Sequence, residues 1–177
     1  MTPVTADSPR RLVLLRHARA EHPAGPDRTR PLALEGRRQA GAVGGALAAA
    51  GLVPDVVLCS SALRTRQTWD LVRQGMGAAG AGARLELRDA LYESGVAELV
   101  GLVTALPPQV RTALVVGHEP TVSEAVAALA GPGSDEAALD RVRHGTPTAG
   151  WAVLEVTGGW AAVGAGTARL DRVGAPA

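Results

Sequence analysis

Two histidines each follow a short apolar segment with the composition of a buried strand. Residues 12–15 lead into Arg16 and His17, and residues 113–116 lead through a glycine into His118. In an open α/β sheet, ligands bind outside the carboxyl ends of the strands, where both imidazoles and the Arg16 guanidinium would meet. Such a cluster of nitrogen donors suits a phosphate group. Because neutral imidazole is also a nucleophile, His17 is the candidate to attack phosphorus.

Arg64 is a third candidate for this site. It follows a second apolar segment, residues 54–59, and lies near the start of a helix that we predict over residues 62–76. Helix N-termini carry unpaired N–H groups and the positive end of the helix dipole, so they attract anions. An arginine there opposes the dipole unless an anion lies beside it. Taken alone, Arg64 fits better as a solvated surface residue paired with Asp70 or a nearby glutamate.

Strand and helix patterns alternate along the chain, which is typical of an α/β fold with parallel crossovers. We expect a three-layer sandwich, in which helices flank a mostly parallel central sheet and a C-terminal hairpin lies at the edge. Two glycines predict the turn of that hairpin, between residues 151–157 and residues 160–163. The predicted strands cover residues 12–15, 54–59, 85–88 and 113–116, and the predicted helices cover residues 34–50, 62–76, 96–106 and 120–130.

The remaining segments carry weaker signals. Residues 75–83, rich in glycine and alanine, are expected to form a flexible surface connection, and residues 131–143 receive no assignment. The length of 177 residues favours one domain over residues 1–177. Within it we expect flexible tails at residues 1–11 and 164–177.

Composition and charge exclude several classes of protein. The net charge is +1 with both signs interspersed, so the basic stripe of a nucleic-acid-binding protein is missing. No apolar run approaches the roughly 20 residues that span a bilayer, and the N-terminal segment does not resemble a signal peptide. We therefore expect a cytoplasmic protein with no nucleic-acid or membrane partner. The abundance of alanine, glycine, proline and arginine suggests a GC-rich bacterial genome.

Two alternatives to a histidine nucleophile are disfavoured. One is a cysteine-dependent phosphatase, and the other is a metal site built from histidines. Cysteine-dependent phosphatases place five residues between Cys and Arg, whereas four separate Cys59 from Arg64. Cys59 also ends an apolar strand, where a buried and inert thiol is expected. The four histidines match no familiar metal site in their spacing, and we expect no metal and no other cofactor. They are His17, His22, His118 and His144.

Together these segments resemble the histidine phosphatase superfamily, also called the phosphoglycerate-mutase-like family. The resemblance covers roughly residues 12–163 and is carried by residues 15–18, 60–68 and 117–119, in their order and spacing. Ala18 stands where the family normally has the glycine of Arg-His-Gly. Residues 27–36 are similar to the "D-x-x-R-P-L-T-x-x-G" stretch of the short bacterial phosphohistidine phosphatases of the SixA type.

The resemblance implies a role for each candidate residue. His17 would be transiently phosphorylated, and Arg16, Arg64 and a protonated His118 would surround the phosphoryl group in place of a metal. Arg30, in the SixA-like stretch, would contribute to substrate binding. Glu93 lies where the mutase and phosphomonoesterase branches place a catalytic glutamate. It is therefore either a general acid or a solvated residue at a helix start.

The expected activity is hydrolysis of a phosphoryl group through a covalent phosphohistidine on His17. A chain this short leaves little room for a lid, so we expect an open, shallow pocket. Such a pocket suits a phosphohistidine on the surface of another protein, and a protein phosphohistidine phosphatase is the favoured function. A phosphomonoesterase acting on a small phosphorylated metabolite is the alternative. A module that binds phosphate or a phosphoprotein without turnover is a second alternative.

Overall fold

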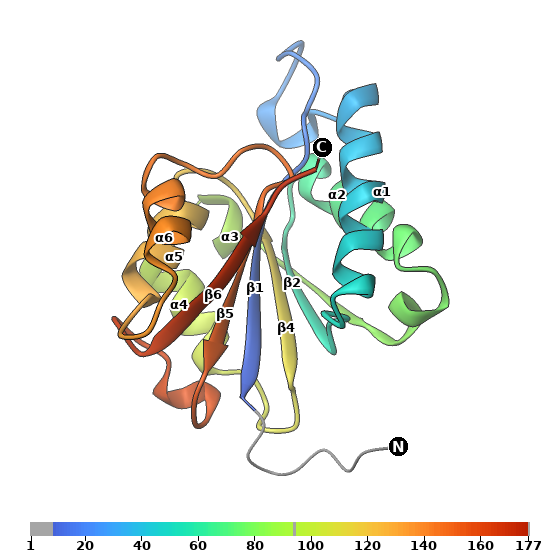
Figure 1. The fold of residues 1–177 in the computed structure, drawn as a ribbon. Helices are drawn as coiled ribbons and strands as arrows, with labels where there is room; N and C mark the ends of the chain where they lie inside the picture. Colours follow the sequence, from blue (N-terminus) through green and yellow to red (C-terminus); the bar gives the residue numbers. More distant parts are fainter. Residues whose placement is uncertain (1–8, 94, 177) are drawn as a thin grey trace.

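The computed structural model describes residues 9–93 and 95–176, and its centre is one six-stranded sheet (Figure 1). The strand order is β3-β2-β4-β1-β5-β6, with parallel pairing from β3 to β1 and antiparallel pairing from β1 to β6. The strands are β1 (Arg10–Arg16), β2 (Val56–Ser60), β3 (Arg84–Arg88), β4 (Thr112–Gly117), β5 (Trp151–Val156) and β6 (Ala168–Gly174).

Helices cover both faces of this sheet, so the predicted α/β sandwich is confirmed (Figure 1). One face carries α1 (Leu34–Ala49) and α2 (Leu63–Gly75). The other face carries α3 (Ala90–Glu93), α4 (Val96–Thr104), α5 (Thr121–Leu129) and α6 (Glu136–Arg143). Short 3₁₀ helices lie at Asp27–Thr29, Gly77–Gly82 and Trp160–Ala162. Within the described residues, no helix combines the length and apolarity needed to cross a membrane.

The inner strands β1, β2 and β4 are apolar on both sides because both faces of the sheet are covered. Alternate side chains of β1 enter different cores: Val13 and Leu15 pack toward α1 and α2, whereas Leu12 and Leu14 pack toward α4 and α5. All four of these side chains are fully buried. Side chains alternate between the faces of a strand, so each face of the sheet builds its own core.

The parallel register brings the predicted site residues to the edge of the sheet that is formed by the carboxyl ends of β1, β4 and β2. Arg16 at the end of β1 pairs with Gly117 at the end of β4, and Cys59 near the end of β2 pairs with Val116. The chain leaves all three strands at this edge. The residues that follow the strands, including His17, therefore gather there.

The predicted C-terminal hairpin has a different second strand. Residues 160–163 were expected to pair with β5, but they include a 3₁₀ helix, and the strand that follows β5 and pairs with it is β6. The expectation of a flexible tail over residues 164–177 is therefore wrong where β6 lies. The side chain of Leu170 is fully buried, and Arg169 pairs across the strands with Glu155. This alternation of buried and charged residues is typical of a strand with one solvated face.

Three further segments differ from the expectation. Arg10 and Arg11, placed in the N-terminal tail, belong to β1, whereas residues 1–8 lie outside the described residues. Part of residues 131–143 forms α6, whose first turn is capped where the Asp135 side chain accepts a hydrogen bond from the Ala138 N–H (2.9 Å). The expected flexible connection at residues 75–83 instead contains a 3₁₀ helix with Gly80 buried.

Helices α1 and α2 approach each other closely at glycines. A Cβ atom on Gly44 would lie 2.1 Å from the carbonyl oxygen of Val72, and one on Gly75 would lie 2.3 Å from the carbonyl oxygen of Gly41. Neither contact can be relieved by rotating a side chain, because the obstructing atoms belong to the backbone. These glycines therefore set the distance between α1 and α2, and α2 carries Arg64.

We predict that Gly44→Ala lowers the free energy of unfolding by about 1–3 kcal/mol, because the two helices must separate to admit the methyl group. Gly41→Ala is the matched control in the same helix, since its Cβ would meet nothing within 4 Å. It should raise the free energy by up to about 1 kcal/mol through helix propensity. Urea unfolding measures both values. Equal effects of the two variants would contradict this account of the α1–α2 contact.

Candidate active site

His17 is the first residue after β1, and hydrogen bonds hold it on both sides. Its N–H donates to the carbonyl of Gly117 (3.0 Å), and its own carbonyl accepts from the N–H of Ala149 (3.1 Å). Its ring Nδ1 lies 2.8 Å from the carbonyl oxygen of Ala18. Because a carbonyl only accepts, Nδ1 must carry the proton, and the lone pair of the neutral ring is on Nε2.

The pKa of His17 is lowered to about 3, mainly by burial and also by the nearby His118, Arg64 and Arg16, against the opposing hydrogen bond to Ala18. The residue is only 8% exposed. At neutral pH the ring is therefore uncharged, which is the form that can act as a nucleophile.

The small residue after His17 is enclosed by α2. Ala18 is fully buried, and its N–H donates to the side-chain oxygen of Thr68 (3.0 Å). Thr68 in turn donates to the carbonyl of Arg64 one turn earlier in α2 (2.7 Å). The turn after β1 and the first turns of α2 are thus held together by a side chain of α2.

His118 follows β4, and the centre of its ring lies 5.2 Å from that of His17. Its Nδ1 is 3.3 Å from Nη2 of Arg64, and its Nε2 is 2.8 Å from Oγ of Ser60. A guanidinium only donates, so Nδ1 is the acceptor and the proton lies on Nε2. Burial, and next the charge of Arg64, lower the pKa of His118 to about 4. The ring is therefore neutral in the anion-free site, and the protonated His118 expected beside a bound phosphoryl group stays a prediction.

Arg64 lies in the first turn of α2 and is only 5% exposed. Its Nη1 donates to the carbonyl oxygen of Asp27 (2.8 Å), and its Nη2 donates to Oδ2 of the same residue (3.0 Å). Within the described part of the chain, its buried Nε has no hydrogen-bond partner. Asp27 therefore both neutralises and orients the guanidinium, which a buried charge requires.

Asp27 connects two further side chains to the site. Oδ2 accepts a hydrogen bond from the Tyr92 hydroxyl (3.1 Å), and Oδ1 forms an ion pair with Arg30 (3.3 Å). Desolvation opposes the shift, but the Tyr92 hydrogen bond and the Arg64 charge hold the pKa of Asp27 below its usual value. The ring of Tyr92 also lies edge-on to His118, with ring centres 5.7 Å apart. Neither Asp27 nor Tyr92 was a candidate in the sequence, although Asp27 begins the SixA-like stretch.

Arg16 is directed toward the segment after α6. Its Nη1 donates to the carbonyl oxygen of Thr146 (2.7 Å), and its backbone N–H donates to the carbonyl of Gly150 (3.0 Å). Its Nε is buried and, among the residues described, makes no hydrogen bond. The charge of Arg16 still acts on both imidazoles, since it lowers the pKa of His17 and of His118.

Comparison with known proteins identifies the family. A model of the histidine phosphatase superfamily (branch 1) matches residues 12–110. The uncharacterized protein Rv1276c of Mycobacterium tuberculosis is 40% identical over 158 residues, which cover 88% of this chain and 96% of that protein. This chain belongs to the histidine phosphatase superfamily. Its membership of this superfamily and its fold support the activity of a phosphatase, and thus of a hydrolase.

Solved structures that are named or assigned as SixA phosphatases have the same fold. One from Nakamurella multipartitia, assigned as a phosphohistidine phosphatase, is 39% identical with a TM-score of 0.80 and covers 95% of this chain and 96% of that one. One from Agrobacterium tumefaciens, with the same assignment, is 29% identical with a TM-score of 0.77, covering 95% and 99%. A protein histidine phosphatase SixA complexed with tungstate is 23% identical with a TM-score of 0.74, covers 94% and 97%, and is similar in fold.

The two other candidate residues, Arg30 and Glu93, form ion pairs with neighbouring charged side chains. Arg30 contacts Asp27 and acts on His118 through its charge, lowering the pKa of that ring. The side chain of Glu93 is 68% exposed at the end of α3, and its carboxylate is 3.8 Å from Arg28. Arg28 also pairs with Asp89. Glu93 thus belongs to a group of exposed charged side chains, those of Arg28, Asp89 and Glu93, which we call the charged rim. Glu93 is one residue beyond Tyr92.

The remaining nucleophile and ligand candidates lie apart from this cluster. Cys59 is fully buried, and burial raises the pKa of its thiol to about 12, so the thiolate is absent at neutral pH. His144, at the end of α6, has Nδ1 2.8 Å from the carbonyl oxygen of Asp140. In the parts of the chain that the structure describes, no three His, Cys, Asp or Glu residues form a group able to hold a metal ion.

We predict that the imidazoles of His17 and His118 stay neutral when the pH falls from 7.5 to 5.5, because burial lowers both pKa values. NMR of the ring C–H groups measures this, with His17→Asn and His118→Asn assigning the signals. Adding tungstate should raise the pH at the midpoint of the His118 titration, since a bound anion favours the protonated ring. A midpoint near 6.5 for either ring without an anion would contradict the prediction.

Proposed function

We propose that this chain is a phosphatase in which Nε2 of His17 takes the phosphoryl group from the substrate. The observation that carries the proposal is the hydrogen bond from Nδ1 to the Ala18 carbonyl, which leaves an unprotonated Nε2 beside a second imidazole and two guanidiniums. A lone pair in a buried, nitrogen-rich site is what nucleophilic attack on a phosphoryl group requires.

The reaction has two displacements at phosphorus. In the first, Nε2 of His17 forms a bond to phosphorus while the bond to the leaving group breaks. In the second, a water oxygen bonds to phosphorus, the bond to Nε2 breaks, and inorganic phosphate forms. The transition state of each step spreads negative charge over three equatorial oxygens. Arg16, Arg64 and His118 are the groups that would stabilise this charge.

The charge state of His118 supports a second role for this ring, as a hydrogen-bond donor to the phosphoryl group. The dianionic phosphoryl group raises the pKa of a nearby imidazole, opposing the effect of burial. His118 is therefore neutral in the free protein, with its proton on Nε2, and gains a second N–H donor at Nδ1 when the anion is bound. It then holds a proton next to the phosphoryl oxygens through both displacements.

A protein phosphohistidine is the proposed substrate. An imidazole leaving group needs less help from an acid than an alkoxide, and the charged rim that holds Glu93 is exposed. The assignment of the Nakamurella structure at 39% identity supports the same choice. A phosphomonoesterase is the second candidate, because Glu93 follows directly after Tyr92, which contacts His118 edge-on.

We predict that a rapid alkaline quench during turnover traps an acid-labile, alkali-stable phosphoryl group on His17. N-phosphoimidazole carrying ³²P serves as substrate, and peptide mapping locates the label. His17→Ala should carry no label, and EDTA should leave turnover unchanged, since we propose that no metal takes part. Undiminished labelling of His17→Ala, or activity lost to EDTA and restored by a divalent ion, would contradict the proposal.

We predict that Glu93→Gln changes turnover of a phosphohistidine substrate by only a few-fold, because the exposed carboxylate pairs with Arg28 and the imidazole leaves readily. An alkyl phosphate and an aryl phosphate provide the comparison. A general acid contributes typically about 10²–10⁴-fold where the leaving group needs a proton. A loss of that size confined to the alkyl phosphate would instead favour the phosphomonoesterase. Asp89→Asn, on the same rim, is the control.

A further inference from the structure

An open pocket of about 430 Å³ lies beside the candidate active site, on the other side of the segment after α6. It lies at the same edge of the sheet as His17, because Leu15 of β1 pairs with Trp151 of β5, and Trp151 pairs with Gly174 of β6. Thr146 belongs to its wall, and the carbonyl of this residue accepts the hydrogen bond from Arg16. One loop residue therefore contacts both the proposed phosphoryl-binding arginine and the pocket.

The pocket is built mainly from apolar groups. Val142, Pro147, Trp151 and Val173 lie in its wall, Arg141 is the charged residue among those that line it, and no acidic side chain belongs to the described lining. A pocket of this size accommodates a large aliphatic or aromatic side chain. Trp151 lies so close to β6 that a Cβ atom on Gly174 would be 2.2 Å from the indole.

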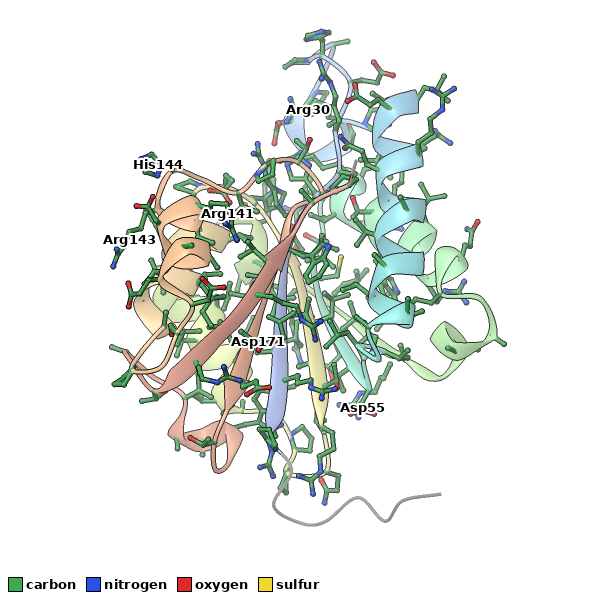
Figure 2. The ribbon with its side chains drawn as sticks, viewed as in Figure 1. Arg30, Asp55, Arg141, Arg143, His144 and Asp171 are labelled. Atoms are coloured by element: carbon green, nitrogen blue, oxygen red, sulfur yellow. The ribbon has the colours of Figure 1, made fainter. Side chains whose placement is uncertain are left out.

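Positive charge gathers next to the pocket, at the last turn of α6. Arg141 and Arg143 lie in this turn, and within the described residues neither forms an ion pair. Figure 2 shows Arg141, Arg143 and His144 around this end of α6, at the end of the molecule where Arg30 also lies. An exposed arginine without a partner is available to an acidic group on another molecule.

We propose that this pocket and the adjacent arginines, which we call the docking surface, bind the protein that carries the phosphohistidine. An apolar side chain close to the phosphohistidine enters the pocket, and acidic residues beside it pair with Arg141 and Arg143. The inference builds on the proposed function and adds the chemistry of the partner. A small metabolite does not fit these observations, because the segment containing Thr146 separates the pocket from His17, and a partner must reach both sides of it.

The test uses four synthetic phosphohistidine peptides of equal length. They differ only in the residues that flank the phosphohistidine. One flanking position is leucine or serine, and the other flanking positions are all glutamate or all lysine. The substrate without any flanking residue is N-phosphoimidazole. We expect kcat/KM of the wild-type protein to be about tenfold higher for the leucine–glutamate peptide than for the serine–lysine peptide.

Two variants then separate docking from chemistry. The double variant Arg141→Glu/Arg143→Glu should invert the preference for glutamate over lysine, and Val173→Glu should abolish the preference for leucine. Both should hydrolyse N-phosphoimidazole like the wild type. Arg73→Glu is the matched control, since this exposed arginine is in the last turn of α2, away from the edge that carries His17. Equal losses on N-phosphoimidazole, or an equal effect of Arg73→Glu, would overturn the docking surface.

Binding is measured independently of turnover, with the same peptides carrying a non-hydrolysable phosphoryl-triazole in place of phosphohistidine. Trp151 lies in the pocket and is 9% exposed, whereas Trp69 and Trp160 are 1% exposed, so tryptophan fluorescence reports on the pocket. Equal affinity for all four analogues overturns the docking surface, even if His17 is labelled and the proposed function stands. Preference in binding without any labelling of His17 supports the docking surface and refutes the proposed phosphatase mechanism. A wild-type dimer that Val173→Glu dissociates would assign the pocket to a second copy of this chain and also overturn the proposal.

Discussion

The parallel pairing of β1, β4 and β2 is the constraint on which the candidate site depends. It directs the chain out of three neighbouring strands at one edge, so residues far apart in sequence meet there. The hydrogen bond from the His17 N–H to the Gly117 carbonyl continues this pairing one residue beyond β1. The backbone of the candidate nucleophile is thus held by the same kind of hydrogen bond as the sheet, and the bond from Nδ1 to the Ala18 carbonyl orients its ring.

Desolvation decides the electrostatics of this edge. Two imidazoles and two guanidiniums lie close together, and the cluster would repel itself if all four groups were charged. Burial resolves this by keeping His17 and His118 neutral, while Asp27 balances Arg64. The free protein therefore holds the site in order without a bound anion, and the positive charge that a phosphoryl group meets comes from the two arginines.

Local patterns in the sequence predict most of the sheet but not the contacts made by its loops. Short apolar runs and parallel crossovers sufficed to predict that His17 and His118 meet at one edge, whereas Arg64 was placed beside them through the resemblance to the family. The strand β6 was missed because its pairing with β5 spans a long connection, and α6 because its start depends on a single cap. The pair between Asp27 and Arg64 joins residues 37 positions apart and depends on the conformation of a loop, which no local periodicity specifies.

The carboxylate of Asp27 has a consequence for the product of the proposed reaction. Arg64 already donates to two acceptors of Asp27 in the absence of any anion, so a phosphate ion gains less from this guanidinium than it would from one surrounded only by water. In the resting site, Asp27 is therefore a competitor of inorganic phosphate for the Arg64 guanidinium. Because this competitor belongs to the loop before α1 rather than to a strand, substitutions in that loop can retune how readily the product departs while the sheet stays unchanged.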